Sequence, residues 1–79
     1  MRLWLSKYTE KDYLNSIVNI RQIKELPNET KMYLSELMFF CIGKSKSFCV
    51  SILNVELSKY YTSRILRQAI VHKLMEGCD

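Results

Sequence analysis

The strongest constraint on the fold lies in residues 54–77, NVELSKYYTSRILRQAIVHKLMEG, which predict a short helix, a tight turn and a longer helix. Thr62 or Ser63 can cap the second helix, because either hydroxyl can accept a backbone N–H from its first turn. Gly77 suits the left-handed conformation in which many helices end. The stretch therefore predicts a helix-turn-helix unit whose second helix covers about 62–76.

The second helix of this unit has two predicted faces. Its apolar residues recur at helical spacing and should pack in the core: Ile65, Leu66, Ala69, Ile70 and Leu74. The opposite face carries Arg64, Arg67, Gln68 and Val71, at positions i, i+3, i+4 and i+7. A helix held by one face and presented by the other is what a DNA recognition helix requires. The candidate DNA-contacting residues are Lys44, Lys46, Tyr61, Thr62, Ser63, Arg64, Arg67, Gln68 and Val71.

Each of these candidates also has a plainer explanation. Arg64 and Arg67 could grip phosphates or guanine edges, or could simply form a solvated helix face. Val71 could meet a thymine methyl group or lie in a protein interface. Lys44 and Lys46 belong to a polar loop, where they would either touch phosphate or only increase solubility.

Length and charge limit the possible classes of protein. The chain has 79 residues, enough for one domain spanning 1–79. Hydrophobic residues make up 48% and charged residues 25%, with two Gly and one Pro, which favours a compact, mainly α-helical fold. The net charge is +4, and residues 44–73 hold six bases (Lys44, Lys46, Lys59, Arg64, Arg67, Lys73) against one acid, Glu56. This local excess favours an anionic partner.

The first half of the chain predicts an arm and two helices. Residues 1–8 are interpreted either as an N-terminal arm or edge strand that lays Leu3, Trp4 and Leu5 on the body, or as a partly ordered N-terminus. Thr9 begins a capping box for a helix over 9–26, which must end before Pro27. Asn28 and its neighbours are expected to cap a helix over 28–42, which Gly43 would stop.

Two apolar segments leave alternatives open. Residues 37–42 (LMFFCI) are apolar all round the helix and predict either the centre of the core or a subunit interface. Residues 48–53 alternate as a short strand does, yet Cys49, Leu53 and Leu57 also follow helical spacing. Asn54 is a reasonable helix cap, so a short strand followed by a separate helix is the preferred interpretation.

Several classes of function find little support in these residues. Cys41, Cys49 and Cys78 form no C-x-x-C pair and His72 is the single histidine, so we expect no metal and no cofactor. A Cys41–Cys49 disulfide is conceivable, but two buried thiols are the simpler interpretation. The Gly-Lys-Ser at 43–45 lacks the first glycine of a phosphate-binding loop, so we expect no nucleotide binding. No Ser–His–Asp catalytic set is apparent, so we do not expect an enzyme. Without a signal peptide or a membrane-length apolar run, the protein is expected to be intracellular and cytoplasmic.

The order of the predicted elements resembles the winged-helix branch of the helix-turn-helix transcriptional regulators. The residues that carry the resemblance are Leu57-Ser58-Lys59, Thr62-Ser63-Arg64, Leu66-Arg67-Gln68-Ala69-Ile70 and Leu74-x-x-Gly77. In that family a Ser or Thr opens the recognition helix and basic residues follow it. The resemblance implies that Thr62, Ser63, Arg64, Arg67 and Gln68 face DNA. The chain departs from the family at Tyr60-Tyr61, where a glycine is usual.

A second resemblance is to the small PapB-type fimbrial regulators, through Asn19-Ile20-Arg21, Leu26-Pro27, Phe39-Phe40 and Ser63-Arg64. Both resemblances imply a DNA-binding transcriptional regulator. We expect a homodimer formed through the first helix or the apolar end of the second. The rival hypothesis is a small adaptor or inhibitor, as many small phage proteins are, which would bind a protein partner through Phe39, Phe40 and Val71.

Overall fold

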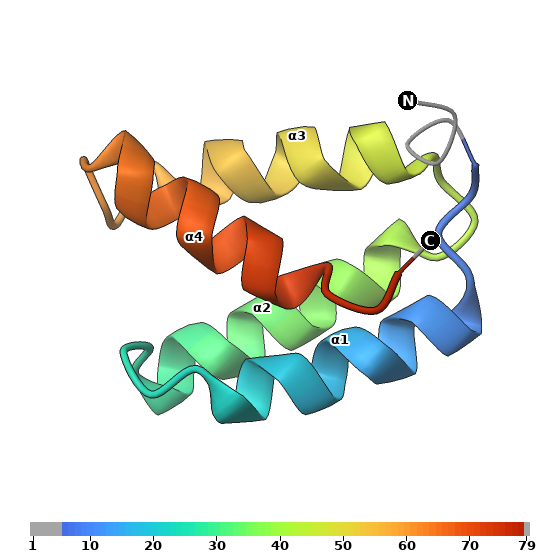
Figure 1. Cartoon of the computed structure of the whole chain (residues 1–79), viewed down its shortest axis with the longest axis horizontal. Helices are drawn as coiled ribbons and strands as arrows, with labels where there is room; N and C mark the ends of the chain where they lie inside the picture. Colours follow the sequence, from blue (N-terminus) through green and yellow to red (C-terminus); the bar gives the residue numbers. More distant parts are fainter. Residues whose placement is uncertain (1–5, 79) are drawn as a thin grey trace.

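In the computed structural model, which describes residues 6–78, the chain forms four α-helices that run up and down in turn (Figure 1). The helices are α1 (Glu10–Gln22), α2 (Asn28–Cys41), α3 (Lys46–Leu57) and α4 (Arg64–Leu74). The expected mainly α-helical fold is confirmed. Helices α1 and α3 each pack against both α2 and α4, so the four helices close into a ring. No helix within residues 6–78 is long and apolar enough to cross a bilayer.

Helix α1 begins as the capping-box pattern predicted. The Thr9 hydroxyl accepts the Asp12 backbone N–H at 3.1 Å, and the Asp12 carboxylate accepts the Thr9 backbone N–H at 2.9 Å. This reciprocal pair satisfies two donors that a helix start leaves unpaired. The helix ends at Gln22, four residues earlier than expected, because Ile23 and Leu26 leave the helical path and are buried in the core instead.

Helix α2 starts without the side-chain cap that the sequence predicted. Pro27 occupies the N-cap position and Asn28 is already the first helical residue, so the Asn28 side chain forms no capping bond. The expectation for this cap was therefore wrong by one position. The glycine stop after α2 is confirmed, since Gly43 has a φ of +90°, a conformation that favours glycine.

The apolar end of α2 is not covered on all sides. Met38 and Cys41 have no exposed surface, but Phe39 and Phe40 are 64% and 53% exposed. Among the described helices α2 packs on α1 and α3, so the core-centre alternative is wrong for Phe39 and Phe40, and the subunit-interface alternative stays a prediction. The two phenylalanines are partly covered. The Tyr13 and Phe39 ring centroids are 5.6 Å apart in an edge-to-face arrangement, and the Lys44 Nζ lies over the Phe40 ring, 4.3 Å from its centroid.

Helix α3 is one continuous helix, so the short strand preferred for residues 48–53 was wrong. Helical spacing prevails because Cys49, Leu53 and Leu57 then all point into the core, each with no exposed surface. The helix begins at Lys46, after Ser45, whose hydroxyl accepts the Phe48 backbone N–H at 3.1 Å. The first helix of the expected helix-turn-helix unit thus starts eight residues before Asn54.

The start of the described chain is fixed to the loop between α2 and α3. Lys7 and Ser45 form an isolated antiparallel bridge, and Tyr8 exchanges backbone hydrogen bonds with Gly43 and Lys44. The Tyr8 side chain is fully buried and its hydroxyl donates to the Ser16 Oγ at 2.7 Å. The Ser16 hydroxyl in turn donates to the Leu74 carbonyl at 3.0 Å, which ties α4 to α1. The expected arm at 1–8 is described only from residue 6, so its Leu3, Trp4 and Leu5 lie outside the described residues.

Candidate nucleic-acid interface

Helix α4 is anchored by its second half alone. Ile70, Val71 and Leu74 are 4%, 7% and 0% exposed, whereas no residue from 62 to 69 is buried. The expected inner face was therefore wrong for Ile65, Leu66 and Ala69, of which Ile65 is 80% exposed. In Figure 1 the first turns of α4 lie beside the end of α3, and α4 approaches α1 only towards its C-terminal end. The first half of α4 is consequently free to contact another molecule.

Val71 lies on the inner face of α4, so the predicted contact of Val71 with DNA was wrong. It was assigned to the outer face with Arg64, but it is buried between α4 and α3 beside Val50. Because α4 packs on both α1 and α3, the neighbouring residues Ile70 and Val71 can both be buried, one towards each helix. The spacing within one helix does not show that a second partner covers its other flank.

A polar hollow of about 400 Å³ lies where the end of α3 meets the start of α4. It is lined by Asn54, Val55, Ser58, Arg64, Arg67 and Gln68. The two arginines and Gln68 were predicted site residues, whereas Asn54 and Ser58 were missed. Asn54 lies in α3 and Ser58 is the C-cap that follows it, four residues later. The alternative of one helix over 47–61 would have placed both on one face.

The turn before α4 is fixed by local hydrogen bonds. Ser63, one of the two predicted caps, is the N-cap, and its hydroxyl accepts the Leu66 backbone N–H at 3.2 Å. The Arg67 guanidinium folds back and its Nη1 donates to the carbonyls of Tyr61 and Thr62, at 2.7 and 2.9 Å. Arg67 is therefore half-buried and already holds the turn, although a guanidinium has five N–H donors and retains others for a ligand.

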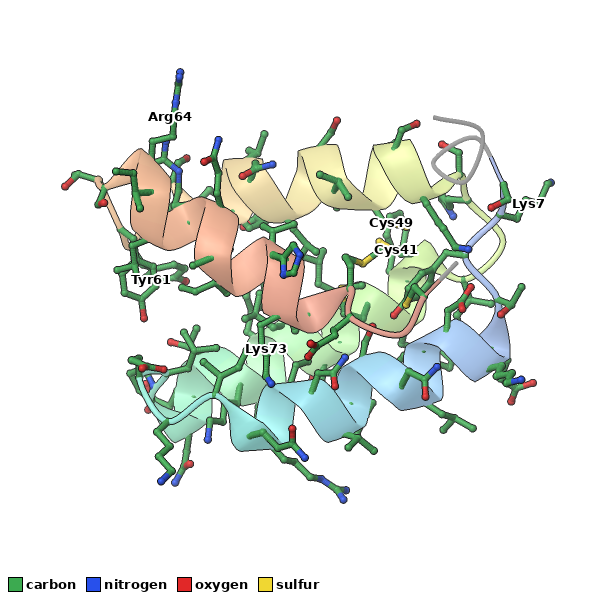
Figure 2. All side chains as sticks on the ribbon, viewed as in Figure 1. Lys7, Cys41, Cys49, Tyr61, Arg64 and Lys73 are labelled. Carbon is green, nitrogen blue, oxygen red and sulfur yellow. The ribbon has the colours of Figure 1, made fainter. Side chains whose placement is uncertain are left out.

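Arg64 is the exposed cation of this hollow. Figure 2 shows its side chain extended away from the body, in the opposite direction from Tyr61. Arg64 forms no ion pair with any residue from 6 to 78, and no acidic residue lines the hollow. Thr62, Ser63 and Gln68 are exposed near it at the start of α4.

The acid nearest in sequence is held elsewhere. Glu56 accepts the Tyr33 hydroxyl at 2.6 Å and pairs with Lys59 at 3.1 Å. These two contacts, the hydrogen bond from Tyr33 first, lower the pKa of the Glu56 carboxyl. Lys73 is likewise paired, with Glu76 at 3.2 Å. The positive charge of Arg64 is thus left without a local counter-ion.

The two loop lysines lie away from this surface. Lys46 is only 4% exposed and its Nζ is 3.6 Å from the Asp12 carboxylate, so the expectation of an exposed loop residue was wrong. Burial of Lys46 is possible because this carboxylate and the Ser6 hydroxyl, at 3.3 Å, surround the charge. Lys44 is half-buried and its Nζ donates to the Phe40 carbonyl at 3.3 Å. Both lysines are separated from Arg64 by α3, about 18 Å long for its 12 residues.

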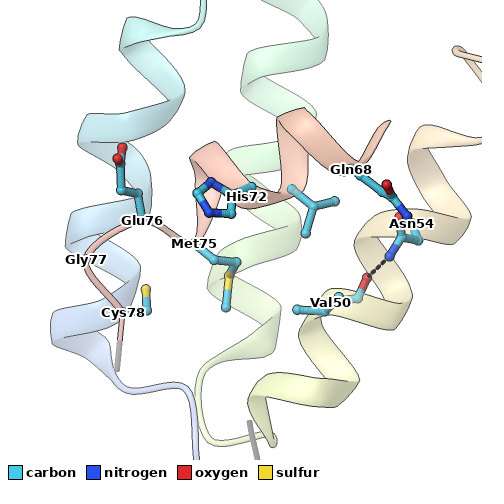
Figure 3. A pocket seen from close by; sticks show the side chains of 9 residues that line it. Val50, Asn54, Gln68, His72, Met75, Glu76, Gly77 and Cys78 are labelled. Carbon is cyan, nitrogen blue, oxygen red and sulfur yellow. Dashed lines mark hydrogen bonds between the residues drawn. The ribbon is translucent and has the colours of Figure 1, made fainter. Parts of the chain in front are cut away.

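A second groove runs between α3 and the C-terminal part of α4 (Figure 3). It measures about 530 Å³, with Val50, Val71, Met75 and Cys78 among its lining residues. It shares Asn54 and Gln68 with the polar hollow, so the two features adjoin. The groove was not predicted, because its walls come from two segments that only the fold brings together.

The cysteines are free thiols, and Cys41 and Cys49 are fully buried. The Cys49 thiol lies 3.7 Å from the Cys41 carbonyl. The neighbouring Cys41 thiol, and after it burial, raises the pKa of the Cys49 thiol. Within residues 6–78 no group of three or more His, Cys, Asp or Glu side chains gathers as a metal site would require.

Comparison with known proteins gave no match among family models, curated proteins or solved structures. The resemblance to winged-helix and PapB-type regulators remains a prediction from the residues that carry it.

Proposed function

We propose that the protein binds double-stranded DNA through the end of α3 and the first two turns of α4, and that it acts as a transcriptional regulator. The observation that carries the proposal is the segment 62–69, the turn and the first half of α4, which holds no buried residue and presents Arg64 beside a hollow without acids. In helix-turn-helix proteins the first residues of the recognition helix contact the base edges. Helix α4 would be that helix in this chain.

The exposed groups match the chemistry of a DNA groove. Arg64 can form paired hydrogen bonds to a guanine edge or a phosphate, and Gln68 can pair with an adenine edge. Ile65, 80% exposed between them, takes the thymine-methyl contact first assigned to Val71. Thr62 and Ser63 stand at the positive end of α4, where a phosphate would be favoured.

Arg67 has a different role in this proposal. Its bonds to the Tyr61 and Thr62 carbonyls fix the turn from which α4 departs. Replacement of Arg67 would therefore change the orientation of Arg64 as well as remove a charge. Arg64→Ala is the cleaner substitution, because the Arg64 side chain bonds to nothing else within residues 6–78.

The test measures the affinity for duplex DNA over a range of salt concentrations. If Arg64 neutralises one phosphate, Arg64→Ala should reduce the slope of log K against log salt by about one unit. If it reads a guanine, the variant should lose preference at one base position, by roughly 1–3 kcal/mol. The matched control is Arg21→Ala, which removes an exposed arginine from α1 and should leave both quantities unchanged.

Wild-type protein that shows no salt-dependent affinity for duplex DNA would overturn the proposal. An equal loss of DNA affinity in Arg64→Ala and Arg21→Ala would show that only the net charge of the protein matters, and not the position of Arg64. Either result would favour the second candidate, an adaptor that binds a protein partner.

The second candidate rests on the exposed aromatic residues of α2. Phe39 and Phe40 are neighbours in the sequence and are 64% and 53% exposed. Adjacent exposed aromatic side chains form an apolar patch of the kind that marks protein interaction sites. A protein partner or a second copy of the chain would cover them, and the expected homodimer belongs here as a proposal. A gel-filtration mass of wild type beside Phe39→Ser tests it: a dimer that the substitution converts to monomer would place the interface on α2.

A further inference from the structure

The outer face of α1 carries an apolar pair between two opposite charges. Helix α1 packs on α2 and α4, and it lies along one side of the molecule in Figure 1. The face that these two helices leave open is marked by the exposed residues of α1: Glu10, Lys11, Leu14, Val18, Arg21 and Gln22. Leu14 and Val18 are 58% and 50% exposed, and they are neighbours on the helix surface, about one turn apart. They form an uncovered apolar pair in the middle of the helix.

The charges at the two ends of this face have no partner among the described residues. Glu10 lies in the first turn of α1 and Arg21 in the last. Neither forms an ion pair with another residue from 6 to 78. Eleven residues are close to three complete turns, so Glu10 and Arg21 lie on one line along the helix, separated by a rise of about 16 Å. Lys11 and Gln22 share this spacing and form a second line, and Leu14 lies between the two lines.

This pattern is complementary to a second copy of itself. The pairs Leu14 and Val18, Glu10 and Arg21, and Lys11 and Gln22 are all centred within half a residue of position 16. If two α1 helices pack antiparallel about a two-fold axis at that position, each pair meets its own image in the other copy. Leucine then meets valine, glutamate meets arginine, and lysine meets an uncharged glutamine. A parallel arrangement would instead bring like charges together, so charge complementarity favours the antiparallel one.

We propose that two copies of the chain form a symmetric dimer in which their α1 helices pack antiparallel, with Leu14 against the partner's Val18 and Glu10 beside the partner's Arg21. The apolar contact supplies the affinity, and the ion pairs set the direction and the register. The inference rests on the homodimer proposed above for Phe39, whose ring centroid is 5.6 Å from that of Tyr13 on α1. It extends that interface from α2 onto α1, and it does not depend on DNA binding.

Charge reversal tests the register of the two helices. Glu10→Arg and Arg21→Glu should each weaken the dimer roughly tenfold or more, because each variant places two pairs of like charges across the contact. The double variant Glu10→Arg/Arg21→Glu should return the dimer affinity to within a few-fold of wild type. A folding defect would not recover in this way, because both reversals oppose the helix dipole and their costs would add. Sedimentation velocity measures the dimer affinity, and circular dichroism verifies that each variant is folded.

Mixtures of the reversed proteins provide a matched control. Glu10→Arg and Arg21→Glu, each monomeric alone, should form a heterodimer when mixed, because the mixture restores both attractive pairs. Lys11→Glu changes the net charge by the same amount as Arg21→Glu, at the position next to Glu10. It should remain a homodimer and should not recruit Glu10→Arg, and native mass spectrometry distinguishes the species. Arg21→Ala leaves the apolar contact intact and should also remain dimeric, because an exposed ion pair contributes little.

Three results would overturn the proposal, each at a different level. Wild-type protein that stays monomeric up to its solubility limit would exclude the homodimer itself and leave the α1 face to a different protein. A wild-type dimer that the charge reversals leave intact would keep the homodimer but refute the antiparallel α1 contact. A double variant as dissociated as the single variants would refute the pairing of Glu10 with Arg21. The DNA-binding proposal is tested separately through Arg64, so its failure can be distinguished from each of these results.

Discussion

The buried hydrogen bonds of Ser16 allow a stability prediction that can be worked out from the structure. Ser16 has no exposed surface, and its hydroxyl accepts from the Tyr8 hydroxyl at 2.7 Å while it donates to the Leu74 carbonyl at 3.0 Å. Ser16→Ala removes both bonds. The Ser16 hydroxyl joins the start of the described chain to α1 and to the end of α4. Loss of its two hydrogen bonds therefore acts where three segments meet.

The two broken bonds do not cost the same. The Leu74 carbonyl keeps the Asn19 Nδ2 as a donor at 3.2 Å, so it stays satisfied. The Tyr8 hydroxyl has only the Asp12 carbonyl left, at 3.4 Å, too long for a good O–H···O bond. A buried group left without a partner costs about 1–3 kcal/mol, so Ser16→Ala should lose roughly 2 kcal/mol.

A double-mutant cycle with Tyr8→Phe separates this penalty from other effects. Tyr8→Phe removes a hydroxyl but leaves Ser16 bonded to Leu74, so it should cost only about 1 kcal/mol. The double variant leaves no unpaired tyrosine hydroxyl and should be no less stable than Ser16→Ala. The expected coupling is therefore about 1 kcal/mol.

Urea denaturation followed by circular dichroism measures all three variants. With a slope near 1–1.5 kcal/mol per M, Ser16→Ala should lower the midpoint by about 1–2 M. The control is Ser51→Ala, an exposed serine of α3, which should stay within roughly 0.5 kcal/mol. Strictly additive free energies in the cycle, or a midpoint equal to that of Ser51→Ala, would refute the reasoning.

Two further predictions follow from burial. Phe40→Ala should cost less than about 1 kcal/mol, because this ring is 53% exposed, whereas Leu53→Ala, at 0% exposure, should cost roughly 2–5 kcal/mol; the reverse order in urea denaturation would contradict the assigned core. Burial also raises the pKa of the Tyr8 hydroxyl above its ordinary value of about 10. The unfolded chain then releases this proton first, so the stabilisation is complete below about pH 10 and declines at higher pH. Tyr8→Phe should make that decline shallower in denaturation curves between pH 9 and 11, and an unchanged decline would contradict the prediction.

The sequence predicted those features whose causes lie within a few residues. The capping box at Thr9 and Asp12, the cap at Ser63 and the left-handed glycines 43 and 77 all depend on groups near in sequence, and all four are present. Four helix-length segments follow from such stop and start signals. Two local predictions were wrong. The cap of α2 is Pro27 instead of Asn28. In residues 48–53 two periods fit equally well, and the core contacts of Cys49 and Leu53 decide between them.

The side-chain directions that depend on distant segments were predicted less well. Lys46 was placed in solvent because its partner, Asp12, is 34 residues away in the sequence and only the fold brings the two together. Val71 was placed outside because one helix cannot show that α1 and α3 cover two of its flanks. For the candidate site, the polar residues at the start of α4 were found, but Asn54 of α3 and Ser58, its C-cap, were not.

The return of α4 to α1 also has a kinetic consequence. The bond between Ser16 and Leu74 closes a loop of 58 residues, whereas α1 and α2 are joined by only five residues, 23–27. Loop-closure entropy makes the longer closure about 2 kcal/mol more costly. Packing contacts of α4 offset this cost only when α1 to α3 already form a surface on which α4 can pack. Residues 64–69 of α4 add little packing of their own, since none of them is fully buried and Arg67 is half-buried. The helix that carries the proposed DNA contacts is therefore expected to dock last during folding and to open first.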